Sequence, residues 1–138
     1  MPEPASNGPT SPFAYAILRV VPDVERGERV NVGVVLFCRQ RGFLGVRIHL
    51  DAARLRALAP DLEIGEVEGH LRGLSRVAEG ADDAGPIAAL SQSERFGWLS
   101  APASTIVQPS EVHTGLCEDP ATTLDNLFKR LVEAPAPA

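Results

Sequence analysis

The sequence predicts an α+β domain: an antiparallel sheet that begins with a three-strand meander, helices packed on one face, and a C-terminal helix. Three apolar runs, at residues 13–21, 30–38 and 43–50, follow one another near the N-terminus and are joined by short polar links. Parallel neighbours would need much longer crossover connections, so these links favour antiparallel pairing. Apolar residues at helical spacing appear only later, in residues 63–78 and again near the C-terminus.

The first run is apolar on both of its alternating faces, as in a central strand, and it ends before Pro22. Residues 23–27 form a polar turn, and the second strand follows at 30–38. Residues 39–42 are a hairpin-type link to the third strand. That strand alternates cleanly, because Leu44, Val46, Ile48 and Leu50 share one face.

Asp51 is a suitable N-cap for a helix over 52–59, which stops before Pro60, and a second helix covers 63–78. A short helix is expected at 86–90. Short strands are predicted at 96–99 and 105–107, with a strand or extended loop at 112–117. The final helix has Asp119 as N-cap and Pro120 as its first residue. Its apolar face comprises Leu124, Leu127, Phe128, Leu131 and Val132.

Length and composition fit one globular domain over residues 13–133, between disordered tails at 1–12 and 134–138. The longest apolar run, residues 32–38, is too short to cross a bilayer, and residues 1–12 lack the basic region of a signal peptide. Cys38 and Cys117 are expected to be reduced thiols that act as small core residues. We therefore expect a cytoplasmic protein without membrane association.

Charge is divided along the chain. Residues 1–60 hold eight arginines against five acids, whereas residues 61–138 hold five basic residues against thirteen acids, which together give the net charge of −5. Either a compact fold mixes the two halves, or an arginine-bearing face meets an acidic partner. Net negative charge disfavours nonspecific binding to nucleic acid, because backbone phosphates must be neutralised.

Asn31 and Gly33 interrupt the most strand-like run of the chain. In a regular strand their two-residue spacing would place both on the same face. A buried asparagine needs hydrogen-bond partners, and a strand glycine marks a bulge or a close backbone approach. Such departures from local preference collect at functional or strained sites.

A second group of polar residues lies in residues 93–119 and includes the single tryptophan. His113 has the chemistry of an acid or base near neutral pH, although anchoring an irregular loop is the more common role of such a histidine. Together with the early strands, this segment offers enough polar groups to line a pocket. The candidate pocket comprises Arg19, Glu28, Asn31, Gly33, Arg95, Trp98, His113 and Thr114.

No metal site or cofactor site is predicted. Asp23, Glu25 and Glu28 lie in one turn, and His49 and Asp51 lie at a strand end, but no known ligand spacing is present. Solvated turn acids are the favoured interpretation. Phosphate-loop, dinucleotide-binding and nucleophile-elbow motifs are absent from the sequence.

Gly65, Gly69 and Gly73 recur every four residues, opposite the apolar stripe of the predicted 63–78 helix. Three interior glycines cost roughly 3 kcal/mol relative to alanine. Either the helix is weak and irregular there, or the flat row is a docking face that lets another backbone approach closely.

Two separated blocks of sequence resemble a bacterial family of unknown function, domain of unknown function 3037. The opening block is Tyr15-Ala-Ile-Leu-Arg-Val-Val-Pro22 with Arg26-Gly-Glu-Arg-Val-Asn-Val-Gly-Val-Val35. The closing block contains Arg95-Phe-Gly-Trp-Leu99, Ser104-Thr-Ile106, Val112-His-Thr-Gly115 and Asp119-Pro120. The resemblance implies no activity; it implies a protein partner, such as a HipA-like kinase-fold protein encoded nearby.

Two hypotheses follow. The preferred one is a non-catalytic accessory module that binds a protein partner, because no catalytic motif is present and the charge is divided. The alternative is a small enzyme that acts on nucleic acid or a phosphorylated substrate. That enzyme requires Glu28, Asn31, Arg95 and His113 to converge in one pocket.

Overall fold

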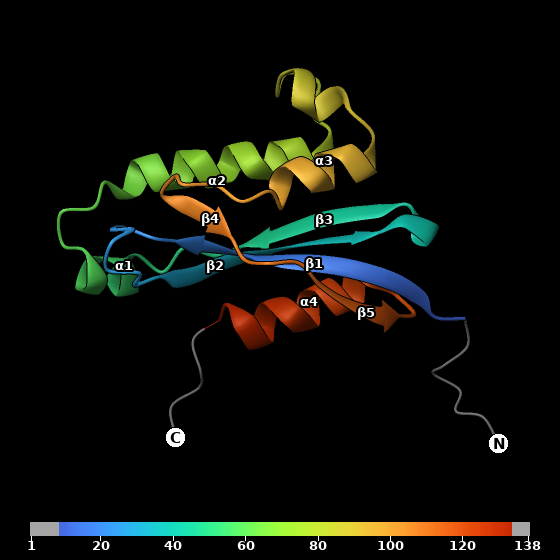
Figure 1. The fold of residues 1–138 in the computed structure, drawn as a ribbon, viewed down its shortest axis with the longest axis horizontal. Coiled ribbons are helices and arrows are strands. Elements are labelled where there is room, and N and C mark those ends of the chain that lie inside the picture. Colours follow the sequence, from blue (N-terminus) through green and yellow to red (C-terminus); the bar gives the residue numbers. More distant parts are fainter. Residues whose placement is uncertain (1–8, 134–138) are drawn as a thin grey trace.

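The computed structural model describes residues 9–133, which form a five-stranded antiparallel sheet with helices on both faces (Figure 1). The strand order is β3-β2-β1-β4, and β5 also pairs with β1, next to β4. The strands are β1 (Ser11–Val20), β2 (Val30–Cys38), β3 (Phe43–Ile48), β4 (Val107–Pro109) and β5 (His113–Cys117). The helices are α1 (Ala52–Leu58), α2 (Ile64–Glu79), α3 (Gln92–Leu99) and α4 (Pro120–Leu131), with 3-10 turns η1 (Arg39–Arg41) and η2 (Pro86–Ala89).

The α+β class, the antiparallel meander of β1, β2 and β3, and the C-terminal helix are confirmed. Asp51 and Asp119 cap α1 and α4 as predicted, because each side chain accepts a hydrogen bond from a backbone N–H of the first turn. The first strand begins at Ser11, inside the segment predicted to be a tail. The other predicted tail residues, 1–8 and 134–138, lie outside the described residues.

Helices cover both faces of the sheet, so the prediction of helices on one face was wrong (Figure 1). On one side, the first core joins β1 and β2 to α1, α2 and α3, with Leu18, Val32 and Leu55 completely buried. On the other side, the second core joins the same strands to α4 through Val34, Leu36 and other residues. The reason was present in the sequence: β1 and β2 are apolar on both faces, and both faces therefore need cover.

Residues 96–99, predicted to be a strand, belong to helix α3. The helix begins with a capping box: the Ser91 hydroxyl accepts from the Glu94 N–H at 3.2 Å, and the Ser91 N–H donates to Oε1 of Glu94 at 3.2 Å. This Ser-x-x-Glu signal outweighs the strand preference of Phe96 and Trp98. Phe96 then stacks on Phe37 with ring centroids 5.6 Å apart, which anchors α3 to the sheet.

The second core contains both cysteines as free, buried thiols. Burial raises the pKa of the Cys117 thiol, and the neighbouring Cys38 raises it further. Both cysteines therefore occupy core positions, as predicted.

The edge strand beside β1 is divided into β4 and β5 by a buried serine. The Ser110 N–H donates to the Ile17 carbonyl at 2.7 Å, and its hydroxyl accepts from the Ile17 N–H at 2.8 Å. The same hydroxyl donates to the carbonyl of Glu111 at 2.8 Å. A side chain thus supplies the hydrogen bond that a regular edge strand would have supplied through its backbone.

Replacing Ser110 with alanine should leave the buried Ile17 N–H without a partner. We expect the free energy of unfolding to fall by about 1–3 kcal/mol, the cost of a buried unsatisfied donor. Chemical denaturation of wild type and Ser110→Ala measures the difference. Ser93→Ala is the matched control, because the Ser93 hydroxyl makes only an exposed hydrogen bond with Arg39 at 3.3 Å. Equal losses in the two variants would contradict the role given to Ser110.

Candidate functional site

The irregularity predicted around Asn31 and Gly33 is a β-bulge. Arg19 of β1 pairs with Asn31 and Leu18 pairs with Gly33, so Val32 is the extra residue of β2. Asn31 faces α4, whereas the Val32 side chain faces the first core. A side chain at Gly33 would point toward the first core as well, because its Cβ would meet Leu18 and Ile48. The prediction that Asn31 and Gly33 share one face was therefore wrong, because the extra residue reverses the alternation between them.

Gly33 also lies at a close backbone approach. A Cβ atom there would stand 2.9 Å from the carbonyl oxygen of Arg47 on β3, and 3.2 Å from Cγ1 of Ile48. Both features that a strand glycine can mark, a bulge and a tight contact, are thus present at this position.

Asn31 is tied to the last helix. Its Nδ2 donates a hydrogen bond of 3.0 Å to the carbonyl of Leu131, in the final turn of α4. The last carbonyls of a helix have no partner within the helix, so the amide satisfies one of them and fixes the end of α4 on the sheet.

Asn31→Leu keeps the bulk of the side chain and removes the amide. We expect a loss of about 1–3 kcal/mol in the free energy of unfolding, because the Leu131 carbonyl then lies against an apolar side chain. Thermal and chemical denaturation measure this loss, and Asn126→Leu on the exposed side of α4 is the control. An unchanged melting temperature with loss of partner binding would instead assign Asn31 to recognition.

The four-residue pocket of the enzyme hypothesis does not form. Arg95 lies on α3, on the opposite face of the sheet from Asn31 and α4 (Figure 1). Its Nη1 donates to the carbonyl of Leu90 at 3.0 Å, so the side chain secures the segment that precedes α3. The capping box turns residues 92–99 into a helix over the first core, and this placement separates Arg95 from the face that Asn31 occupies. The convergence of Glu28, Asn31, Arg95 and His113 is contradicted.

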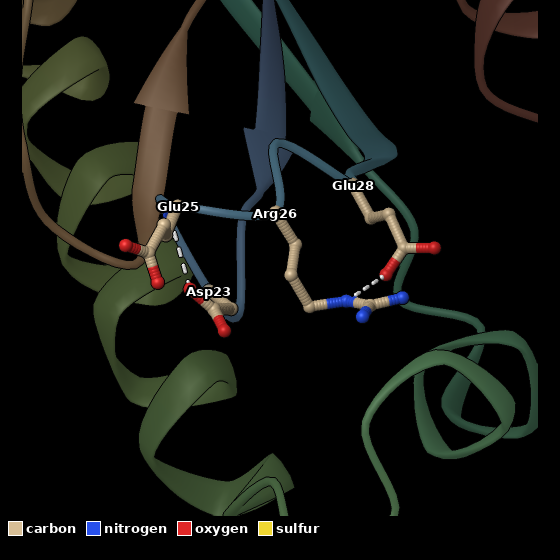
Figure 2. Close-up of polar contacts among 4 residues, drawn as sticks. All are labelled: Asp23, Glu25, Arg26 and Glu28. Atoms are coloured by element: carbon tan, nitrogen blue, oxygen red, sulfur yellow. Dashed lines mark hydrogen bonds and ion pairs between the residues drawn. The ribbon is translucent and has the colours of Figure 1, made fainter.

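Glu28 is also engaged elsewhere. It lies in the exposed turn between β1 and β2, where its Oε1 accepts a 2.7 Å hydrogen bond from Nε of Arg26 (Figure 2). This hydrogen bond holds the pKa of the Glu28 carboxyl below its ordinary value. In the same turn, Oδ1 of Asp23 accepts from the backbone N–H of Glu25 at 3.0 Å. Across residues 9–133, no group of three or more potential metal ligands is gathered.

Trp98 and Thr114 lie apart from Asn31 as well. Trp98 is half-exposed and lines a small apolar cleft of about 250 Å³ between α2, the end of α3, the loop after it and β4. Thr114 is exposed on β5. Of the eight candidate residues, Gly33 and Arg95 thus face the other side of the sheet from Asn31, and Glu28, Trp98 and Thr114 lie in other surroundings.

Two candidates, Arg19 and Asn31, are cross-strand partners on the α4-side face of the sheet, whereas His113 lies further along the same face, opposite Tyr15 in the pairing of β1 with β5. Arg19 lies directly opposite Asn31 in the strand pairing, and the ring of His113 lies against that of Tyr15 with centroids 5.2 Å apart. The sequence did not indicate two further members, Arg29 and Glu111, because they lie just outside β2 and β5 and are linked to Arg19 by charge in the folded chain. We call this group the polar strip; its members are Tyr15, Arg19, Arg29, Asn31, Glu111 and His113.

Charges interact across the polar strip. A hydrogen bond from its own backbone N–H lowers the pKa of the Glu111 carboxyl, and His113, Arg19 and Arg29 lower it further. Burial lowers the pKa of the Arg19 guanidinium, and so does the like charge of Arg29, whereas Glu111 raises it. The strip is therefore a cationic area of an otherwise acidic protein.

The second unusual surface is the outer edge of β5. This strand pairs with β1 on one side only within the described chain. His113 and Cys117 face the α4 side, so strand alternation directs Thr114 and Leu116 to the other side, and Val112 immediately precedes the strand. Val112 is 45% exposed and Leu116 is 68% exposed, which is unusual for large apolar side chains.

Comparison with known proteins assigns a family. Between residues 9 and 133, no helix has the length and apolar character needed to cross a membrane. Searches of curated proteins and of solved structures found no match. A family model does match residues 15–132, which is most of the chain and includes the bulge, the polar strip and β5. The chain therefore belongs to the family described as "Protein of unknown function (DUF3037)".

Proposed function

We propose that this domain is a non-catalytic accessory module that binds a protein partner along the outer edge of β5. The observation that carries the proposal is that an open strand edge and exposed apolar side chains occur together at β5. An open edge presents unpaired backbone N–H and C=O groups, and proteins usually protect such edges with lysine, proline or a covering element. β5 contains neither lysine nor proline.

An extended segment of another protein fits this surface. Such a segment adds a strand to the sheet, so that backbone hydrogen bonds give affinity and alternate side chains give specificity. Leu116 lies on the side of β5 away from α4, and Val112, four residues earlier, immediately precedes the strand and is exposed as well. The partner segment is therefore expected to place apolar side chains at alternate positions on that face, and to bury the two exposed residues on binding.

Family resemblance suggests the first partner to test, a HipA-like kinase-fold protein encoded nearby. The proposal places the module in the cytoplasm, which agrees with its two free thiols. The net charge of −5 supports a protein rather than a nucleic acid as the partner.

Co-expression followed by size-exclusion chromatography tests the proposal. Wild-type domain is expected to elute with the kinase-fold protein, and the double variant Val112→Lys, Leu116→Lys is expected to elute alone. Val24→Lys is the matched control, because Val24 is 61% exposed but lies in the turn between β1 and β2.

Separate elution of the wild-type domain and the kinase-fold protein would reject that partner. Equal binding by the double variant would reject the edge of β5 as the docking surface. A wild-type dimer that the double variant dissociates would make a second copy of this chain the occupant of the edge.

A further inference from the structure

The cleft beside Trp98, between α2, the end of α3, the loop after it and β4, has the size of a site for one side chain. Its volume is about 250 Å³, and a cavity of about 150 Å³ is already enough to hold a benzene molecule. Buried side chains of the first core form its floor, among them Leu18, Leu74 and Val107. A hollow of this size with an apolar floor fits a single large apolar side chain. We call it the Trp98 cleft.

The walls of the Trp98 cleft favour an aromatic occupant. The Trp98 side chain is 46% exposed, so much of its apolar surface is in contact with water. His70 of α2, which is partly exposed, supplies a second aromatic ring, and Pro102 and Pro109 line the cleft as well. Aromatic rings attract one another by more than their buried area contributes. An aromatic side chain in the cleft therefore gains more than an aliphatic one.

The Trp98 cleft lies along the same edge of the sheet as β5. Strands β4 and β5 pair with the same side of β1 and are separated only by residues 110–112. Val107 and Pro109 of β4 line the cleft. Leu116 of β5 faces away from α4, and α2 and α3, which form the cleft, also cover the face of the sheet opposite α4 (Figure 1). The exposed apolar side chain of β5 and the cleft therefore share one face of one edge.

We propose that the Trp98 cleft binds an aromatic side chain of the partner segment that adds to the edge of β5. This inference rests on the proposed function, because it takes the partner to be an extended chain along that edge. Pro109 precedes Val112 by three positions, which is about 10 Å of extended chain. The segment thus reaches the cleft by continuing a few residues past Ser110. Tryptophan is also enriched among the residues that contribute most to binding at interfaces.

Trp98 is the only tryptophan of the chain, so its fluorescence reports directly on the cleft. N-acetylphenylalaninamide and N-acetylleucinamide are titrated separately into the whole chain. We expect a saturable change with the phenylalanine probe in the millimolar range, as for a single side chain, and weaker binding of the leucine probe. Equal affinities for the two probes would overturn the aromatic specificity. The absence of a saturable change with either probe would overturn the cleft as a binding site.

A variant that fills the cleft separates binding in the site from nonspecific contact with the indole. Ala103 lines the cleft from an exposed loop, so Ala103→Leu places a larger side chain there without disturbing the core. We expect the phenylalanine probe to bind this variant about tenfold more weakly. Ser104→Leu is the matched control, because Ser104 is exposed in the same loop and does not line the cleft. Equal affinities for wild type and Ala103→Leu would contradict the proposal.

Co-expression with the kinase-fold protein separates this inference from the proposed function. The double variant Val112→Lys, Leu116→Lys is expected to elute alone and still bind the phenylalanine probe, whereas Ala103→Leu is expected to lose both interactions. If Ala103→Leu binds the partner as wild type does, the cleft takes no part in docking, and the proposed site at β5 stands without it. Separate elution of the wild-type domain would reject the kinase-fold partner, and the fluorescence titration would still decide whether the cleft binds an aromatic side chain.

Discussion

Replacing Gly33 with alanine is expected to destabilise the domain by about 3 kcal/mol, at the upper end of the usual cost of overpacking. The added Cβ would lie 2.9 Å from the backbone carbonyl oxygen of Arg47 and 3.3 Å from Cδ1 of Leu18. The carbonyl belongs to the neighbouring strand and cannot move without disturbing the pairing of β2 with β3. Relief would require widening the sheet at its bulge.

Chemical denaturation of wild type and Gly33→Ala measures this change. The free energy of unfolding of Gly115→Ala is measured for comparison, because the added Cβ there meets the ring of Phe13, a side chain, and not the backbone. We expect a smaller loss for Gly115→Ala, since a ring adjusts more easily than a strand. A Gly33→Ala variant as stable as wild type would show that the two strands are not in contact at this point.

The triple replacement of Gly65, Gly69 and Gly73 with alanine is expected to raise the free energy of unfolding by about 2–3 kcal/mol. Helix α2 runs without interruption from Ile64 to Glu79, so the row does not produce the irregular helix that was one of the two expectations. At each of these positions a Cβ would meet no atom within 4 Å. Alanine therefore gains helix propensity at no steric cost.

Thermal and chemical denaturation measure the gain, and Gly80→Ala provides the opposite control. Gly80 ends α2 with φ of +69°, which disfavours any residue with a side chain, so this variant should lose stability. If the free energy of unfolding of the triple variant is no higher than that of wild type, the three glycines contribute to stability in a way that offsets their low helix propensity. A more stable triple variant that no longer binds the partner would identify the row as a docking face.

Binary pattern was enough to predict most elements of the fold. The alternation of β3, the apolar stripe of α2 and the capped start of α4 all depend on neighbouring residues, and all were predictable. The two apolar faces of β1 implied that helices cover both faces of the sheet. They did not indicate which helix packs on which face. The strand predicted at 96–99 was wrong because the capping signal of Ser91 with Glu94 outweighs the strand preference of the aromatic residues that follow it.

The candidate site was predicted less well, for two physical reasons. A bulge changes the face of every residue beyond it, so Asn31 and Gly33 could not be placed from spacing alone. Long polar side chains also find local partners: Arg95 binds backbone carbonyls near its own helix, and Glu28 binds Arg26. Arg19, Asn31 and His113 were identified by residue type, whereas their neighbours Arg29 and Glu111 required the tertiary structure.

Ser110 gives the outer margin of the sheet a further property. Ser110 divides the edge strand into β4, with three residues, and β5, with five. A strand added from another molecule can therefore form only a short hydrogen-bonded ladder on either piece. Short, interrupted margins resist the open-ended stacking of sheets that leads to fibrils. The interrupted edge therefore offers no long surface on which many copies of the chain could polymerise.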